Sequence, residues 1–245
     1  MTQGDQFPQN SLIIFQKGTV IFMIYVAPSL LAADFANLES DVKRVTTAGA
    51  NYLHLDVMDG AFVPNISFGA PVIAALRPKS KLIFDVHLMI NEPIRYLNDF
   101  VKAGADIITF HLEACSDPKK MIREIHDREV KCGLAISPAT PVEKIIPYLS
   151  EIDMALIMTV VPGFGGQSFM PEMMDKVRTV RRYAESQNLK LDIQVDGGLK
   201  PENVGVVTAA GANIIVAGSS VFGAKKPSAV IAKMREEADL NPYQA

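Results

Sequence analysis

The stretch Ala48-Gly49-Ala50-Asn51 recurs twice along the chain, as Ala103-Gly104-Ala105-Asp106 and as Ala210-Gly211-Ala212-Asn213. Each copy follows a segment with helical periodicity and precedes an apolar segment typical of a strand. The glycine therefore fits the residue just past a helix end, and the Asn or Asp after it begins a strand. The copies start at residues 48, 103 and 210, so their spacings are 55 and 107. This ratio of nearly 1:2 predicts two and then four βα units of about 27 residues each.

Strand-like segments occur in the number that this spacing requires. Eight are expected, at residues 25–29, 52–57, 81–89, 106–111, 131–137, 154–160, 191–197 and 213–219. Helix-patterned segments such as 172–186 separate them, and several helices are expected to open with a proline, at Pro71, Pro93, Pro118, Pro141 and Pro201. Alternating strands and helices require a parallel sheet, and eight units favour a closed barrel over an open sheet. The predicted fold class is α/β, a single (β/α)8 TIM barrel.

Composition excludes several classes of protein. Of 245 residues, 49% are hydrophobic and 21% charged, so the chain can bury a large core. A net charge of −3 argues against a basic surface for nucleic acid. Two cysteines, Cys115 and Cys132, make no disulfide framework and fit a cytoplasmic protein. The apolar segment 12–31 is interrupted by Lys17 and Gly18, so we expect no membrane span and no signal peptide.

Polar residues gather at the carboxyl ends of the predicted strands, where barrels of this type carry their sites. His54 and Asp56 lie two apart on one strand and so point to the same face. With His87 and Asp196 from other strands they can converge on one ion, and two imidazoles with two carboxylates suit Zn²⁺, Fe²⁺, Mn²⁺ or Co²⁺. The alternative is that each histidine is a hydrogen-bonded core residue.

Glycine-rich loops follow the last three strands and indicate a phosphate site, because backbone N–H groups can close on an anion there. The candidate contacts are Gly163, Phe164, Gly165, Gly166, Gly197, Gly198, Gly218 and Ser219. Simple turn chemistry is the alternative for each loop taken alone. Met58, Met89 and Met158 also lie at strand ends. They are either core residues or an apolar lining of the site.

Five motifs of the chain, taken together, resemble the ribulose-phosphate 3-epimerase family in matching order. They are A-P-S-L-L-A-A-D-F (27–35), H-L-D-V-M-D-G-x-F-V-P-N (54–65), D-V-H-L-M (85–89), P-G-F-G-G-Q (162–167) and V-D-G-G (195–198). The resemblance runs from about Ile24 to the C-terminal helix. It implies a barrel of the ribulose-phosphate-binding type and a metal-dependent isomerase that interconverts D-ribulose 5-phosphate and D-xylulose 5-phosphate. The implied setting is carbohydrate metabolism, in the pentose phosphate pathway or a photosynthetic carbon cycle.

The resemblance also implies roles for individual residues. His54, Asp56, His87 and Asp196 would hold one divalent ion, with Zn²⁺ first among the four candidates, and Asp56 and Asp196 would be the catalytic acid/base pair. Ser29, His87, Asp196 and the loop residues named above would contact the substrate. A physical argument agrees with this pair: inverting a carbon beside a ketone needs an acid/base group on each face and a stabilised enediolate.

The sequence leaves one alternative function open and argues against two others. An epimerase of a hexulose 6-phosphate, such as allulose 6-phosphate, can share the chemistry and the metal site. Orotidine-monophosphate decarboxylases and hexulose-phosphate synthases carry D-x-K-x-x-D on the third strand, whereas this chain has His87 in place of the lysine. A barrel that binds a sugar phosphate without turning it over has no use for two acidic residues facing one carbon.

The chain is expected to divide into two parts. Residues 1–22 precede the usual start of the family pattern, and we expect a disordered arm or a non-native start there; the catalytic barrel occupies residues 23–245. The expected partners are a small sugar phosphate and further copies of this chain, as a homo-oligomer, with neither nucleic acid nor membrane.

Overall fold

The computed structural model describes residues 14–16, 19–21 and 23–244. Eight parallel strands form one sheet in the order β3-β10-β9-β8-β7-β6-β5-β4. They are β3 (Tyr25–Pro28), β4 (Tyr52–Met58), β5 (Ile83–Met89), β6 (Ile107–His111), β7 (Lys131–Ile136), β8 (Met154–Met158), β9 (Asp192–Asp196) and β10 (Ile214–Ala217). A parallel bridge between Ser29 and His54 joins the two edge strands, so the sheet closes into the predicted barrel.

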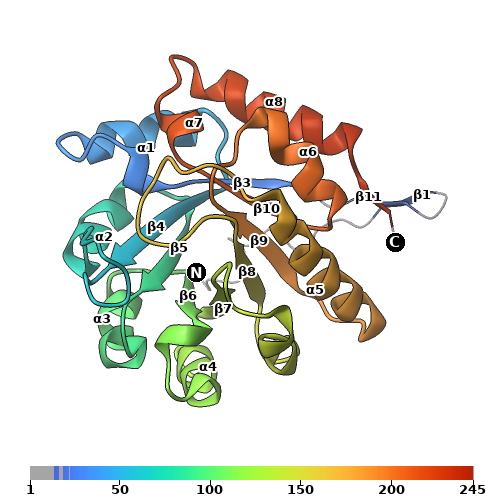
Figure 1. Cartoon of the computed structure of the whole chain (residues 1–245). Coiled ribbons are helices and arrows are strands. Elements are labelled where there is room, and N and C mark those ends of the chain that lie inside the picture. Colours follow the sequence, from blue (N-terminus) through green and yellow to red (C-terminus); the bar gives the residue numbers. More distant parts are fainter. Residues whose placement is uncertain (1–13, 17–18, 22, 245) are drawn as a thin grey trace.

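Helices surround this ring of strands on the outside (Figure 1). They are α1 (Leu38–Thr47), α2 (Ala70–Leu76), α3 (Leu97–Lys102), α4 (Pro118–His126), α5 (Met174–Ser186), α6 (Pro201–Ala209), α7 (Ser219–Phe222) and α8 (Pro227–Leu240). The repeated turns end α1, α3 and α6. Gly49, Gly104 and Gly211 have φ values of 92°, 93° and 108°, which confirms the prediction that each glycine sits just past a helix end.

One expected helix is absent from the described chain. Between β7 and β8 the structure has two 3₁₀ turns, Val142–Lys144 and Ile146–Tyr148, where a helix opening at Pro141 was expected. Pro147 has no N–H and its ring would clash with the carbonyl four residues before it, so an α-helix cannot run through this segment.

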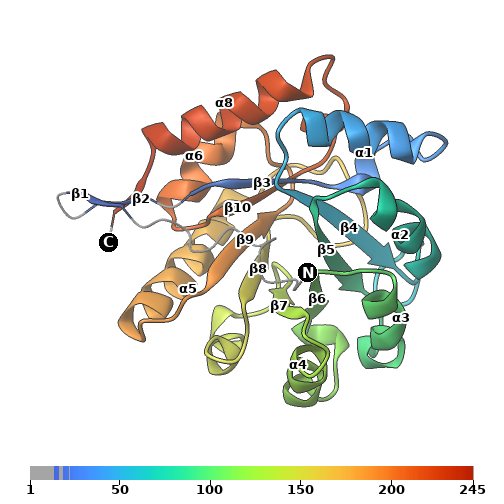
Figure 2. The ribbon, with the colours of Figure 1, turned by 180° about the vertical axis from the view of Figure 1, so that it is seen from behind.

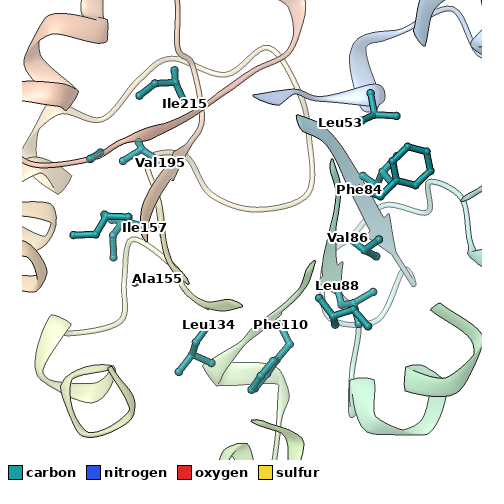
Figure 3. Packing of buried hydrophobic residues seen from close by; sticks show 14 of the residues in the cluster. Leu53, Phe84, Val86, Leu88, Phe110, Leu134, Ala155, Ile157, Val195 and Ile215 are labelled. Carbon is teal, nitrogen blue, oxygen red and sulfur yellow. The ribbon is translucent and has the colours of Figure 1, made fainter. Parts of the chain in front are cut away.

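Alternation along the strands sorts side chains between two environments. Leu53, Leu55 and Val57 of β4 belong to the large apolar cluster, which also contains side chains from the helices. Phe84, Val86 and Leu88 of β5 belong to the same cluster. Figure 3 shows residues of this cluster distributed around the ring of strands. The intervening residues, among them His54 and Asp56, therefore point into the barrel, because successive side chains of a strand face opposite sides.

Apolar side chains fill the amino-terminal end of the barrel. Tyr25, Tyr52, Ile83, Ile107, Met154 and Ile214 form a separate buried cluster on the first residues of their strands. The Tyr25 and Tyr52 rings pack with their centroids 5.7 Å apart. This plug leaves the carboxyl ends of the strands as the side from which a ligand can enter.

A second, small sheet involves the beginning and the end of the chain. Its order is β1-β2-β11, formed by β1 (Ile14–Gln16), β2 (Thr19–Ile21) and β11 (Tyr243–Gln244), with antiparallel pairing. Figures 1 and 2 place it at the edge of the molecule, beside the end of the chain. Residues 1–13, 17–18 and 22 lie outside the described residues. The expectation of a disordered arm or a non-native start at residues 1–22 therefore stays a prediction. Among the helices described, none has the length and apolar character needed to cross a membrane.

Candidate active site and metal centre

Four predicted ligands meet at the carboxyl ends of β4, β5 and β9. His54, Asp56, His87 and Asp196 each offer one nitrogen or oxygen atom, and these four atoms all lie within 4.8 Å of one another. The register of the sheet explains the meeting, because Asp56 pairs with His87 on the neighbouring strand. Both histidines are fully buried, and the Asp196 side chain keeps 16% of its surface exposed.

The spacing of these atoms fits a small divalent ion. Nε2 of His54 lies 3.2 Å from Oδ1 of Asp56, 3.3 Å from Nδ1 of His87 and 3.6 Å from Oδ2 of Asp196. Ligands about 2.0–2.1 Å from a tetrahedral zinc ion stand about 3.3 Å apart. Two nitrogens and two carboxylate oxygens are also the donors that Zn²⁺, Fe²⁺, Mn²⁺ and Co²⁺ accept. The residues present therefore fit such an ion.

Buried polar residues that the sequence reasoning did not assign hold His54. Oδ2 of Asp85 lies 2.7 Å from Nδ1 of His54 and accepts a 2.6 Å hydrogen bond from Nε2 of Gln194. Thr109 donates to the other oxygen of Asp85. Asp85 and Gln194 occupy inward positions two residues before His87 and Asp196, and this period of two is the signal that could have identified them.

Asp56 is held by hydroxyl groups as well as by histidines. Ser29 donates a 2.5 Å hydrogen bond to Oδ2 of Asp56, and Ser67 donates to the backbone carbonyl of the same residue. Ser29, predicted to contact substrate, thus also orients a carboxylate that faces the metal centre.

A second chain of contacts runs from His87 away from the metal centre. Its Nε2 lies 2.9 Å from Nε2 of His111, whose Nδ1 lies 3.2 Å from Oε2 of Glu113. Burial lowers the pKa of His111 to about 4. The sequence places His111 at a strand end but indicates no role for it, and Glu113 carries no sequence signal.

The two carboxylates of the metal centre differ in protonation. Burial raises the pKa of Asp196 to about 7, and the negative charge of Asp56 adds to this effect. Burial also opposes ionisation of Asp56, but the charge and hydrogen bond of His54, with those of His87, hold the pKa of Asp56 well below its usual range. Before an ion binds, Asp56 is therefore an anion and Asp196 can hold a proton near neutral pH.

A cavity of about 620 Å³ opens above these residues. Most of the predicted substrate contacts line it, namely Ser29, Gly163, Phe164, Gly165, Gly166, Asp196, Gly197, Gly198, Gly218 and Ser219. Met58, Met89 and Met158 also line the cavity. This agrees with the interpretation of these methionines as an apolar lining of the site. His87, predicted to be both a ligand and a substrate contact, is fully buried and is not part of the cavity wall.

The cavity loop after β9 depends on glycine at two consecutive positions. A Cβ atom on Gly197 would lie 2.7 Å from the methyl groups of Val160, and one on Gly198 would lie 2.4 Å from the backbone nitrogen of Phe169. Both residues also have positive φ, at 130° and 68°. Asn65 ties the loop after β8 into place, because its Nδ2 donates a 2.8 Å hydrogen bond to the carbonyl of Gly163.

Comparison with known proteins identifies close relatives of this chain. Residues 25–222 match the model of the ribulose-phosphate 3 epimerase family. A ribulose-phosphate 3-epimerase of Candida glabrata is 48% identical over 228 residues, covering 86% of this chain and 91% of that protein. The cytoplasmic isoform of ribulose-phosphate 3-epimerase from Oryza sativa subsp. japonica is 47% identical, covering 87% of this chain and 94% of that protein.

Solved structures share the fold at much lower sequence identity. A 3-hexulose-6-phosphate synthase from Salmonella typhimurium superposes with a TM-score of 0.64 at 17% identity, covering 89% of this chain and 100% of that chain. A phosphoribosyl anthranilate isomerase from Thermotoga maritima gives a TM-score of 0.63, also at 17% identity, with 89% and 99% covered. These likenesses support the barrel fold alone.

Proposed function

The chain belongs to the ribulose-phosphate 3-epimerase family, and on this premise we propose that it interconverts D-ribulose 5-phosphate and D-xylulose 5-phosphate with one divalent metal ion per subunit. The observation that carries the proposal is the convergence of two carboxylates and two imidazoles within 4.8 Å beneath the cavity. A site that only bound a sugar phosphate would not need two carboxyl groups beside two buried imidazoles beneath the cavity.

Asp56 and Asp196 are the proposed acid and base. Epimerisation at carbon 3 removes a proton from one face of the carbon and returns one to the opposite face, so the two groups must flank a planar intermediate. Asp56 comes from β4 and Asp196 from β9, and strands β3 and β10 lie between them in the sheet. Each aspartate serves one face, and the two exchange roles when the reaction runs in reverse.

His54 and His87, with the two aspartates, would hold the ion through His54 Nε2 and His87 Nδ1, the nitrogens that face the carboxylates. When bound, the ion supplies positive charge beside the substrate oxygens, which lowers the cost of removing a proton from carbon. Zn²⁺ heads the candidates, and Fe²⁺, Mn²⁺ and Co²⁺ share its ligand preferences.

The loops after β8, β9 and β10 would bind the substrate phosphate. Gly197, Gly198, Gly218 and Ser219 line the cavity, and backbone N–H groups there would suit an anion in a protein whose net charge is −3. Met58, Met89 and Met158 line the wall and would limit access of water to the reacting carbon.

The setting of the enzyme is proposed on fewer observations. A cytoplasmic location is supported by the rice relative, which is named a cytoplasmic isoform. A place in the pentose phosphate pathway stays a prediction. Assembly into a homo-oligomer stays a prediction, which light scattering of the purified protein would test.

The test is a comparison of substrates at a fixed metal load. The purified protein is stripped with a chelator, reloaded with Zn²⁺, Fe²⁺, Mn²⁺ or Co²⁺, and assayed with D-ribulose 5-phosphate and with allulose 6-phosphate. We expect formation of xylulose 5-phosphate that disappears on stripping and returns on reloading, with the higher kcat/KM for the pentose. Preference for the hexulose would contradict the proposed substrate, and full activity after stripping would contradict the proposed metal.

A further inference from the structure

His111 is a fully buried histidine beside the metal centre that the proposed reaction does not use. It ends β6, and its Nε2 lies 2.9 Å from Nε2 of His87. On its other side, Nδ1 lies 3.2 Å from a carboxylate oxygen of Glu113. The ring of Phe62 covers His111 with the centroids 4.9 Å apart, which limits access of water to the contact between the two histidines.

We propose that His111 and Glu113 form a relay of hydrogen bonds that fixes the tautomer of His87 and so makes its Nδ1 a metal ligand. The inference rests on the metal site proposed above. In this relay both residues are positioning residues, because they act through His87 and do not line the cavity.

The proton positions follow from the order of the contacts. Nδ1 of His87 faces Oδ1 of Asp56 within the metal centre, so a neutral His87 that binds metal must carry its proton on Nε2. That N–H then needs an acceptor, and the atom in reach is Nε2 of His111. His111 accepts only if its own proton is on Nδ1, where the Glu113 carboxylate accepts it.

Glu113 is itself fixed so that it can act only as an acceptor. Its Oε1 accepts a 2.8 Å hydrogen bond from the backbone N–H of Ser137 and another from the hydroxyl of Thr140. Nζ of Lys176 donates to the carbonyls of Ser137 and Thr140, which ties this loop to α5. The second carboxylate oxygen is thereby left facing His111.

The same geometry predicts what a neutral amide would do at position 113. In Glu113→Gln the amide oxygen must accept from Ser137 and Thr140, so the NH₂ group faces Nδ1 of His111. His111 would then carry its proton on Nε2, against the N–H of His87. Relief of that clash moves the His87 proton to Nδ1, which blocks the metal-binding nitrogen.

The experiment measures Co²⁺ affinity of chelator-stripped protein by competition with a chromophoric chelator. The variants are Glu113→Gln, His111→Phe, His111→Gln and the double variant His111→Gln with Glu113→Gln. In His111→Gln the side-chain oxygen can accept the hydrogen bond from His87 Nε2. Because an amide does not exchange a proton between two ring nitrogens as histidine does, residue 113 can no longer influence the tautomer of His87. The matched control is His126→Gln, since His126 pairs with Asp153 at 2.9 Å on the exposed end of α4.

We expect Glu113→Gln and His111→Phe to weaken Co²⁺ binding by about 10- to 100-fold. The Co²⁺ affinity of His111→Gln should stay within about threefold of wild type. Adding Glu113→Gln to His111→Gln should then leave the Co²⁺ affinity unchanged, whereas a loss of packing alone would give the same effect in both backgrounds. The control His126→Gln should leave Co²⁺ affinity unchanged, because His126 pairs with Asp153 away from the site.

Equal Co²⁺ affinity of wild type and Glu113→Gln would overturn the relay and leave the proposed reaction intact. Glu113→Gln decides the question by itself if His111→Phe does not fold. Wild-type protein that binds no Co²⁺ would overturn the proposed metal site and the relay together.

Discussion

One carboxylate oxygen of Asp56 and one of Asp196 lie within 4.8 Å of each other, although the two residues come from β4 and β9 near opposite ends of the chain. Two buried carboxyl groups this close cannot both ionise easily. Their pKa values are accordingly shifted in opposite directions, with Asp196 raised to about 7 and Asp56 lowered. An incoming metal ion must therefore displace a proton from Asp196 rather than from Asp56.

Replacing either aspartate should stop epimerisation. Because each serves one face of the carbon, Asp56→Asn and Asp196→Asn should each lower kcat by about a hundredfold to ten-thousandfold at saturating metal. Steady-state assays with D-ribulose 5-phosphate measure this loss. Asp175→Asn is the control, because the Asp175 side chain is 86% exposed on α5, and its kcat should match wild type. Wild-type rates in either site variant would remove that residue from the acid/base pair.

Asp85 should matter for stability through its oxygen rather than its charge. Asp85→Ala leaves the His54 ring N–H and the Gln194 amide without their buried acceptor, which should cost about 3 kcal/mol of unfolding free energy. In Asp85→Asn one oxygen can still accept from both, and the new NH₂ group can donate to the Thr109 hydroxyl. Urea unfolding should therefore show a clearly smaller loss for Asp85→Asn than for Asp85→Ala. Equal losses would show that the charge decides.

The barrel and the positions of its strands could be predicted because they depend on local pattern. The three repeated turns required glycine at positive φ, and β4, β6 and β10 each follow one of these turns directly. The convergence of His54, Asp56, His87 and Asp196 could be predicted because they occupy inward positions on strands whose ends meet. The helix expected after β7 was wrong because the prediction rested on Pro141 as a helix start and neglected Pro147, which prevents an α-helix there.

The supporting residues could not be predicted in the same way. Glu113 reaches His111 only because a 3₁₀ turn, Leu112–Ala114, follows β6 and because Ser137 and Thr140 from the next loop hold its carboxylate. Such contacts depend on tertiary packing between loops, for which a single sequence carries no period or motif. The side chain of Asn65 is a similar case, since its partner is a backbone carbonyl far along the chain.

Removing the Asn65 contact should weaken substrate binding more than turnover. Asn65→Ala deletes the hydrogen bond to the Gly163 carbonyl and frees the loop that lines the cavity. One neutral hydrogen bond contributes about 0.5–1.5 kcal/mol, so KM should rise about two- to tenfold while kcat changes less than twofold. Asn98→Ala, which deletes a contact with Arg128 on the surface, is the control and should leave KM unchanged. A fall in kcat with unchanged KM would contradict this role.

Metal affinity should depend on pH through Asp196. Its pKa is raised to about 7 by burial, so below pH 7 an incoming ion must displace a proton from it. Between pH 5 and 7, log affinity for Co²⁺ should therefore rise with pH more steeply in wild type than in Asp196→Asn, by about one unit per pH unit. Without metal, the raised pKa of Asp196 makes the free energy of unfolding fall as pH rises. The stability that protonated Asp196 contributes is fully present below about pH 4 and is lost as pH rises to 7. Parallel lines for the two proteins would contradict the assignment.

The most direct test of the proposed chemistry follows the hydrogen on carbon 3. D-Ribulose 5-phosphate is incubated in D₂O with metal-loaded protein, with chelator-stripped protein and with reloaded protein, and proton NMR follows carbon 3. A two-base epimerase predicts deuterium at carbon 3 together with xylulose 5-phosphate in the loaded and reloaded samples, and neither in the stripped one. Xylulose 5-phosphate that keeps its original hydrogen at carbon 3 throughout, or no exchange in fully loaded protein, would contradict the exchange of protons between Asp56 and Asp196.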